Sequence, residues 1–128
     1  MILLLDTHAF LWWVEDAAPL SRAARRAIRD RRNECFVSLA SAWEIAIKAS
    51  LGKLRLGAPL ERFIPEHMAA NGFGLLGIEF DDIARVASLP FHHRDPFDRL
   101  LVAQALRRDL VIASRDRSFD RYGVERIW

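Results

Sequence analysis

The chain has 128 residues, of which 52% are hydrophobic and 28% are charged. This length and composition predict a single folded domain over residues 1–128 and exclude a disordered tail. Lysine and arginine number 19 against 17 acidic residues, so local basic patches must hold any anionic partner. No apolar run approaches the ~20 residues that span a bilayer, and no signal peptide is visible. The single cysteine, Cys35, favours a reducing compartment, so we expect a cytoplasmic protein.

Short apolar runs alternate with helical patterns along the chain. The apolar runs predict strands at Ile2–Leu5, Cys35–Val37, Leu75–Ile78 and Leu110–Ala113, with an edge strand within Val124–Trp128. Helices are predicted through Phe10–Trp13, from Pro19 onward, and over Ser38–Ser50, Pro59–Asn71, Asp81–Leu89 and Asp98–Arg108. This alternation predicts a three-layer α/β/α sandwich with a mainly parallel central sheet.

Acidic residues fall where parallel sheets place their ligand sites. Asp6 follows the first strand, and Asp116 follows the fourth. Glu44 lies on the helix after the second strand, and Asp98 lies early in another helix. Because ligands bind beyond the carboxyl ends of parallel strands, we expect these four carboxylates to converge.

Each acid also has a structural interpretation. Asp6 suits a helix N-cap, and Asp116 suits the cap of a turn. Asp95 and Asp98 flank Pro96, so Asp95 is predicted to cap a helix whose first turn carries Asp98. The position of each acid, taken singly, does not distinguish a helix-capping role from a functional role.

Carboxylates that converge on one place repel one another, and this repulsion must be offset. Two carboxylates about 4 Å apart repel by about 4 kcal/mol at an effective dielectric constant near 20, whereas a helix cap returns only about 1 kcal/mol. Either the pKa values rise or a cation lies among the acids. Oxygen ligands select Mg²⁺ or Mn²⁺, and no Cys/His spacing indicates a zinc site. Hydrolysis of a phosphodiester is the natural chemistry of such a centre.

Three motifs resemble those of the PIN-domain ribonucleases, and more narrowly those of VapC-type toxins of type II toxin–antitoxin systems. They are Leu3–His8, Ser41–Lys48 and His92–Ala105, the last with the specific run Asp-Pro-Phe-Asp-Arg-Leu-Leu. The resemblance implies a Mg²⁺- or Mn²⁺-dependent endoribonuclease, usually a homodimer, that a cognate antitoxin silences. The family's catalytic and metal-binding acids correspond to Asp6, Glu44, Asp98 and Asp116.

Side chains beside these motifs have more than one interpretation. Lys48 and Arg99 either contact the phosphates of the substrate or pair with the acids. Ser114 matches the family's small hydroxyl residue near the fourth acid, and the resemblance makes it a candidate contact to the substrate. His92 and His93 either touch RNA or pack within their loop.

Aromatic and basic residues elsewhere leave similar alternatives. Trp12 and Trp13 are predicted in the core or a dimer interface, and otherwise in an apolar groove for the antitoxin. The six arginines between residues 22 and 32 are predicted to form a solvated helix face, with RNA contact as the alternative. An RNA path at the sheet edge would use Arg107, Arg108, Arg115 and Arg117.

The leading hypothesis is an endoribonuclease toxin that leaves a 5′-phosphate and a 3′-hydroxyl. The alternative is a catalytically weak PIN-fold protein that acts mainly as a partner-binding module. A small-molecule phosphatase ranks low, because its second aspartate is expected at the position of His8. An antitoxin is expected to insert an arginine or lysine into the acidic pocket and displace the metal.

Overall fold

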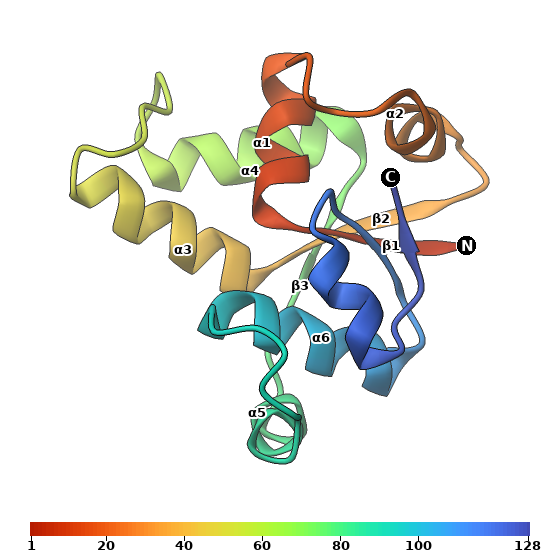
Figure 1. Ribbon diagram of the computed structural model, residues 1–128. Coiled ribbons are helices and arrows are strands. Elements are labelled where there is room, and N and C mark those ends of the chain that lie inside the picture. The colour runs from red at the N-terminus through yellow and green to blue at the C-terminus, as the bar shows by residue number, and fades with distance from the viewer.

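The computed structural model describes residues 1–128 and is built around a five-stranded sheet (Figure 1). The sheet order is β3-β2-β1-β4-β5, and every neighbouring pair is parallel. The strands are β1 (Ile2–Leu5), β2 (Glu34–Ser38), β3 (Gly74–Leu76), β4 (Val111–Ala113) and β5 (Arg126–Ile127). The predicted α/β architecture is therefore confirmed, with a sheet that is parallel throughout.

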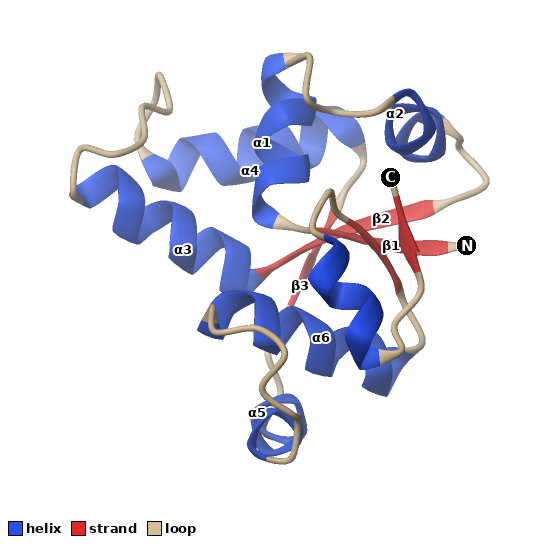
Figure 2. Cartoon of the chain, viewed as in Figure 1, coloured by secondary structure: helices blue, strands red, loops and turns tan.

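Helices cover both faces of this sheet (Figure 2). The helices are α1 (Thr7–Glu15), α2 (Arg22–Arg29), α3 (Leu39–Ser50), α4 (Leu60–Asn71), α5 (Phe80–Ala87) and α6 (Pro96–Arg108), with a 3₁₀ helix η1 (Arg117–Tyr122). Helices α1, α2 and α4 pack on one face, and α6 and η1 pack on the other. Helix α5 packs on α6. None of the helices has the length and apolar character needed to traverse a lipid bilayer.

Alternation along β1 divides the core in two. Leu3 and Leu5 belong to the hydrophobic cluster that includes Phe10 of α1, whereas Leu4 belongs to the opposite cluster with Leu101 of α6. All three leucines are fully buried. Side chains of successive strand residues point to opposite faces, so an unbroken apolar strand requires a layer of helices on each side.

Strand β3 was predicted over Leu75–Ile78 but begins one residue earlier, at Gly74, and ends two residues earlier, at Leu76. A Cβ atom at this position would lie 2.5 Å from a ring carbon of Phe36 on the neighbouring strand. Glycine therefore allows β3 to pair closely with β2. The short η1 helix was absent from the expected elements.

Side-chain caps start the helices directly after the strands that feed them. Asp6 accepts a hydrogen bond from the backbone N–H of Ala9 at 2.8 Å, so α1 begins at Thr7 with Asp6 as the single residue between it and β1. Ser38 caps α3 in the same way at the end of β2. These caps bring the first turns of α1 and α3 to the carboxyl edge of the sheet.

Candidate metal centre

All four predicted acids line one cavity of about 140 Å³. Its lining consists of Asp6, Thr7, His8, Glu44, Lys48, Asp95, Asp98 and Asp116. These residues come from the ends of β1 and β4 and from α1, α3 and α6 with its N-cap. The convergence expected from the sequence is therefore present.

Asp6 is both the N-cap of α1 and a wall of the cavity. Its backbone N–H donates to the carbonyl oxygen of Ala113 at 3.1 Å, which ties the end of β1 to β4. Burial raises the pKa of the Asp6 carboxyl, and hydrogen bonds from the Ser114 side chain and the Ala9 backbone oppose that rise. The structural and functional interpretations of Asp6 are thus compatible.

Glu44 is buried and has a donor on each carboxylate oxygen. The hydroxyl of Thr7 donates to Oε1 at 2.6 Å, and the ammonium group of Lys48 donates to Oε2 at 2.7 Å. Lys48 therefore pairs with an acid, one of its two predicted roles, while it lines the cavity. Thr7 is a site residue that the sequence did not single out, because the contact joins residues 37 positions apart.

Asp98 is placed by the cap of its own helix. The carboxylate of Asp95 accepts hydrogen bonds from the backbone N–H groups of Phe97 at 2.8 Å and Asp98 at 3.1 Å, as predicted for a cap. Burial raises the pKa of Asp98 to about 8, and the charges of Asp95, Asp6, Glu44 and Asp116 add to the rise. The cavity therefore disfavours a further negative charge.

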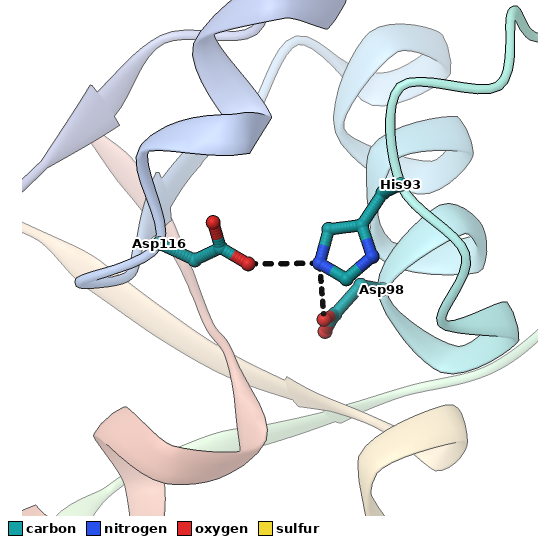
Figure 3. Close-up of side chains that lie close together, drawn as sticks. All are labelled: His93, Asp98 and Asp116. Carbon is teal, nitrogen blue, oxygen red and sulfur yellow. Dashed lines mark hydrogen bonds and ion pairs between the residues drawn. The ribbon is translucent and has the colours of Figure 1, made fainter.

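His93 bridges two of the acids (Figure 3). Its Nε2 atom lies 2.8 Å from Oδ2 of Asp116 and 3.0 Å from Oδ2 of Asp98. Its Nδ1 atom accepts the backbone N–H of Asp95 at 3.1 Å, which assigns the ring proton to Nε2. This N–H is shared between the two carboxylates. The sequence placed His93 near the site but could not distinguish this role from loop packing.

Asp116 differs from the other acids in its exposure. Its side chain is 43% exposed, and it caps η1 by accepting the backbone N–H of Ser118 at 2.9 Å. Burial pushes the pKa of Asp116 upward, but hydrogen bonds from Ser118 and His93 outweigh it and hold the pKa below its ordinary value. Ser114 supports the same turn, because its hydroxyl accepts the backbone N–H of Asp116 at 3.0 Å.

Arg99 lies outside the cavity, so the structure does not place it against a phosphate there. It is buried, and its guanidinium donates to the hydroxyl of Tyr122 at 3.2 Å. It also donates to three carbonyl oxygens, those of Val86, Leu89 and Pro90. Arg99 therefore holds the end of α5 and the loop that carries His93.

The predicted RNA path through Arg107 and Arg108 is also not favoured by the structure. Both guanidinium groups pair with the fully buried carboxylate of Asp82 on α5. Asp82 in turn accepts the backbone N–H of Glu79 at 2.8 Å. These two arginines join α5 to α6.

The donor set fits a hard divalent cation. One nitrogen of His93 and one oxygen each of Asp98 and Asp116 lie within 4.8 Å of one another, and of these atoms only the two carboxylate oxygens have lone pairs free for a cation in this tautomer of His93. Asp6 and Glu44 face the same cavity outside this tight group. Because the ring proton of His93 is on Nε2, oxygen atoms are the ligands that remain, which favours Mg²⁺-like ions. The raised pKa of Asp98 indicates charge that a cation would neutralise.

Comparison with known proteins identifies the class to which this fold and site belong. Residues 3–125 match the family model described as the PIN domain. The match covers nearly the whole chain, and this protein therefore belongs to the PIN-domain family.

Two curated relatives are ribonucleases of Mycobacterium tuberculosis. The chain is 30% identical to ribonuclease VapC22 over 115 residues, which cover 89% of this chain and 86% of the relative. It is 38% identical to ribonuclease VapC16 over 63 residues, which cover 49% of this chain and 45% of the relative.

Solved structures share the fold at low sequence identity. The chain superposes on a chain of VapBC2 from Rickettsia felis, solved bound to a promoter DNA fragment, with a TM-score of 0.73 and 11% identity over 100% of this chain and 99% of that one. A chain of DNA-bound VapBC from Salmonella typhimurium gives a TM-score of 0.67 and 15% identity, covering 99% and 97%. These likenesses establish the PIN fold.

Proposed function

We propose that this protein is a metal-dependent endoribonuclease and the toxin of a toxin–antitoxin pair. The observation that carries the proposal is the convergence of Asp6, Glu44, Asp98 and Asp116 on one cavity that fits a divalent cation. The similarity to ribonuclease VapC22 over most of both chains supports RNA as the substrate. We infer Mg²⁺ or Mn²⁺ as the metal, because carboxylate oxygens are the ligands that the four acids offer and such ions prefer oxygen.

The four acids differ in exposure: Asp6 and Glu44 are buried, Asp98 is partly buried, and Asp116 is exposed. Asp6, Glu44 and Asp98 would hold the principal ion, while Thr7 and Lys48 fix the Glu44 carboxylate. When bound, the ion polarises the phosphoryl group and stabilises the charge that develops on its oxygens.

Asp116 has the exposure needed to meet the substrate. Its lowered pKa keeps it an anion at neutral pH. Each of its oxygens already accepts one hydrogen bond, from Ser118 or from His93, and keeps a further lone pair that can accept a hydrogen bond from the water that attacks phosphorus. In-line attack by water needs no ribose 2′-hydroxyl, so the products carry a 5′-phosphate and a 3′-hydroxyl.

Cleavage assays with purified protein test this proposal. We expect RNA cleavage with Mg²⁺ or Mn²⁺, its loss in EDTA, and its loss in Asp6→Asn and Asp98→Asn variants that remain folded by circular dichroism. Asp109→Asn, at an exposed position after α6, is the matched control and should cleave normally. Full activity in both site variants would overturn the assigned roles.

The partner in this proposal is a cognate antitoxin. The VapBC assemblies that share the fold support it. Expression in cells distinguishes this proposal from its alternative, in which the protein is a weakly catalytic binding module. The toxin alone should arrest growth, whereas Asp98→Asn should not, and a module that lacks activity would give the same growth in both cases. We infer a cytoplasmic location, for which the single cysteine is the supporting observation, and a homodimer stays a prediction.

A further inference from the structure

A second cavity of about 420 Å³ adjoins the acidic one. It is lined by Asp6, His8, Trp12, Arg115, Asp116 and Arg117. It shares three of these residues, Asp6, His8 and Asp116, with the candidate metal centre. A ligand in this groove therefore lies directly beside the acids, and the volume is within the ~300–1,000 Å³ typical of small-ligand sites.

An aromatic wall on α1 forms one side of the groove. The rings of His8 and Trp12 stack with centroids 5.3 Å apart and planes 17° from parallel. Trp128 tilts against Trp12, with centroids 5.8 Å apart. Packing on the core holds Trp12 partly buried, while His8 is exposed. Trp12 is thus held in place by packing before any ligand arrives, and His8 stacks on it.

Two free cations line the same groove. Arg115 and Arg117 are exposed, and neither forms an ion pair in the structure. Other arginines near this end of the sheet are already engaged: Arg99 with carbonyl groups and Arg126 with Asp120. Arg115 and Arg117 therefore remain available for an anionic ligand.

We propose that this groove binds single-stranded RNA next to the scissile phosphate, and this rests on the proposed ribonuclease activity. One unpaired base stacks on the His8–Trp12 wall, while Arg115 and Arg117 contact the flanking phosphates. Aromatic rings and cations along one groove are the combination that binds single strands, because any base offers a ring face. Bases inside a duplex are stacked on their neighbours, so the groove selects unpaired RNA.

Binding measurements separate this proposal from the activity itself. Fluorescence anisotropy with a short labelled single-stranded RNA is performed on Asp98→Asn protein, in which cleavage is blocked. Adding Arg115→Gln and Arg117→Gln should weaken binding about tenfold and reduce the slope of log K against log salt by about 1.4, as for two lost phosphate contacts. The matched control, Arg22→Gln with Arg26→Gln on the exposed face of α2, removes equal charge and should change neither quantity.

The stacking of a base on His8 and Trp12 is tested separately, by fluorescence. An RNA containing 2-aminopurine should lose fluorescence on binding, and His8→Ala with Trp12→Leu should restore it, while a duplex of the same sequence should bind weakly.

Equal losses in the groove and α2 variants would overturn the proposal, because only net charge would then matter. It would also fail if the groove variants bound RNA normally but lost affinity for the antitoxin, since the groove would then be a protein-docking surface. If wild-type protein cleaved no RNA, the proposed function would fail while the binding data still tested the groove.

Discussion

The four acids owe their different behaviour to the groups that surround each carboxylate. Glu44 has a donor on each oxygen, and Asp116 is exposed and hydrogen-bonded, so both have their charge compensated. Asp98 is partly buried, shares the single N–H of His93 with Asp116, and faces the other acids. Asp98 is therefore the residue at which the charge of the metal-free cavity is most costly.

Asp98 is expected to make the metal-free fold less stable as pH rises. Its pKa is about 8 in the fold against 3.8 ordinarily, so between these values the folded state binds a proton that the unfolded state lacks. The free energy of unfolding therefore falls as pH rises from about 4 to about 8. Asp98→Asn should remove this slope and stabilise the protein by roughly 2–4 kcal/mol at pH 8. Urea unfolding in EDTA at several pH values measures this pH dependence of the free energy of unfolding. Asp109→Asn is the control and should keep the wild-type slope.

The same proton should couple metal binding to pH. Because Asp98 is protonated at neutral pH in the metal-free protein, binding of Mn²⁺ must release that proton. The affinity should rise by up to about tenfold per pH unit below pH 8 and level off above it. Calorimetry in two buffers of different ionisation enthalpy counts the released protons. A pH-independent affinity would contradict the assignment of Asp98 as a ligand.

Helix α5 depends on one buried carboxylate for its place against α6. Asp82 is fully buried and accepts hydrogen bonds from Arg107, Arg108 and the backbone of Glu79. Asp82→Asn leaves these donors poorly matched and should cost about 2–4 kcal/mol, measured by urea unfolding. Asp81→Asn is the matched control, because the neighbouring side chain is 74% exposed and should cost under about 0.5 kcal/mol. Equal effects of the two substitutions would contradict the role given to Asp82.

The loop over residues 90–95 is held by side chains from two other elements. Tyr122 of η1 accepts the backbone N–H groups of His92 and His93, and Arg99 of α6 donates to the carbonyl of Pro90. Arg99→Lys cannot reproduce the planar set of donors. We expect it to cost about 1–3 kcal/mol and to speed hydrogen exchange of the loop amides, while the amides of β1 stay protected. Unchanged exchange in the loop would show that Arg99 does not position His93.

At the scale of the whole molecule, a cation in the proposed site should stabilise the carboxyl edge of the sheet. The cavity joins the ends of β1 and β4 to α1, α3 and α6, so a cation in it links elements that are far apart in sequence. Mn²⁺ at 100 times its dissociation constant should add about 2.7 kcal/mol to the stability and raise the Tm, and EDTA should reverse the shift. In thermal scans Asp98→Asn should show a much smaller shift. An equal shift in both proteins would place the ion elsewhere.

The sequence by itself determined the order of strands and helices, the parallel sheet and the positions of the four acids. These follow from local causes: unbroken apolar runs form buried strands, and Asp6, Ser38 and Asp95 cap the helices that follow. An acid one residue past a strand must lie at the carboxyl edge of the sheet, whatever the rest of the chain does.

Only the tertiary structure decided which polar side chains bond to one another and which bond to backbone carbonyl groups. His93 meets Asp116 across 23 residues, and Arg99 is engaged by loop carbonyls instead of a phosphate. The groove of His8, Trp12 and the two free arginines likewise joins α1 to the turn after β4. A long polar side chain has several partners of similar energy within its reach, and the packing of distant segments selects among them.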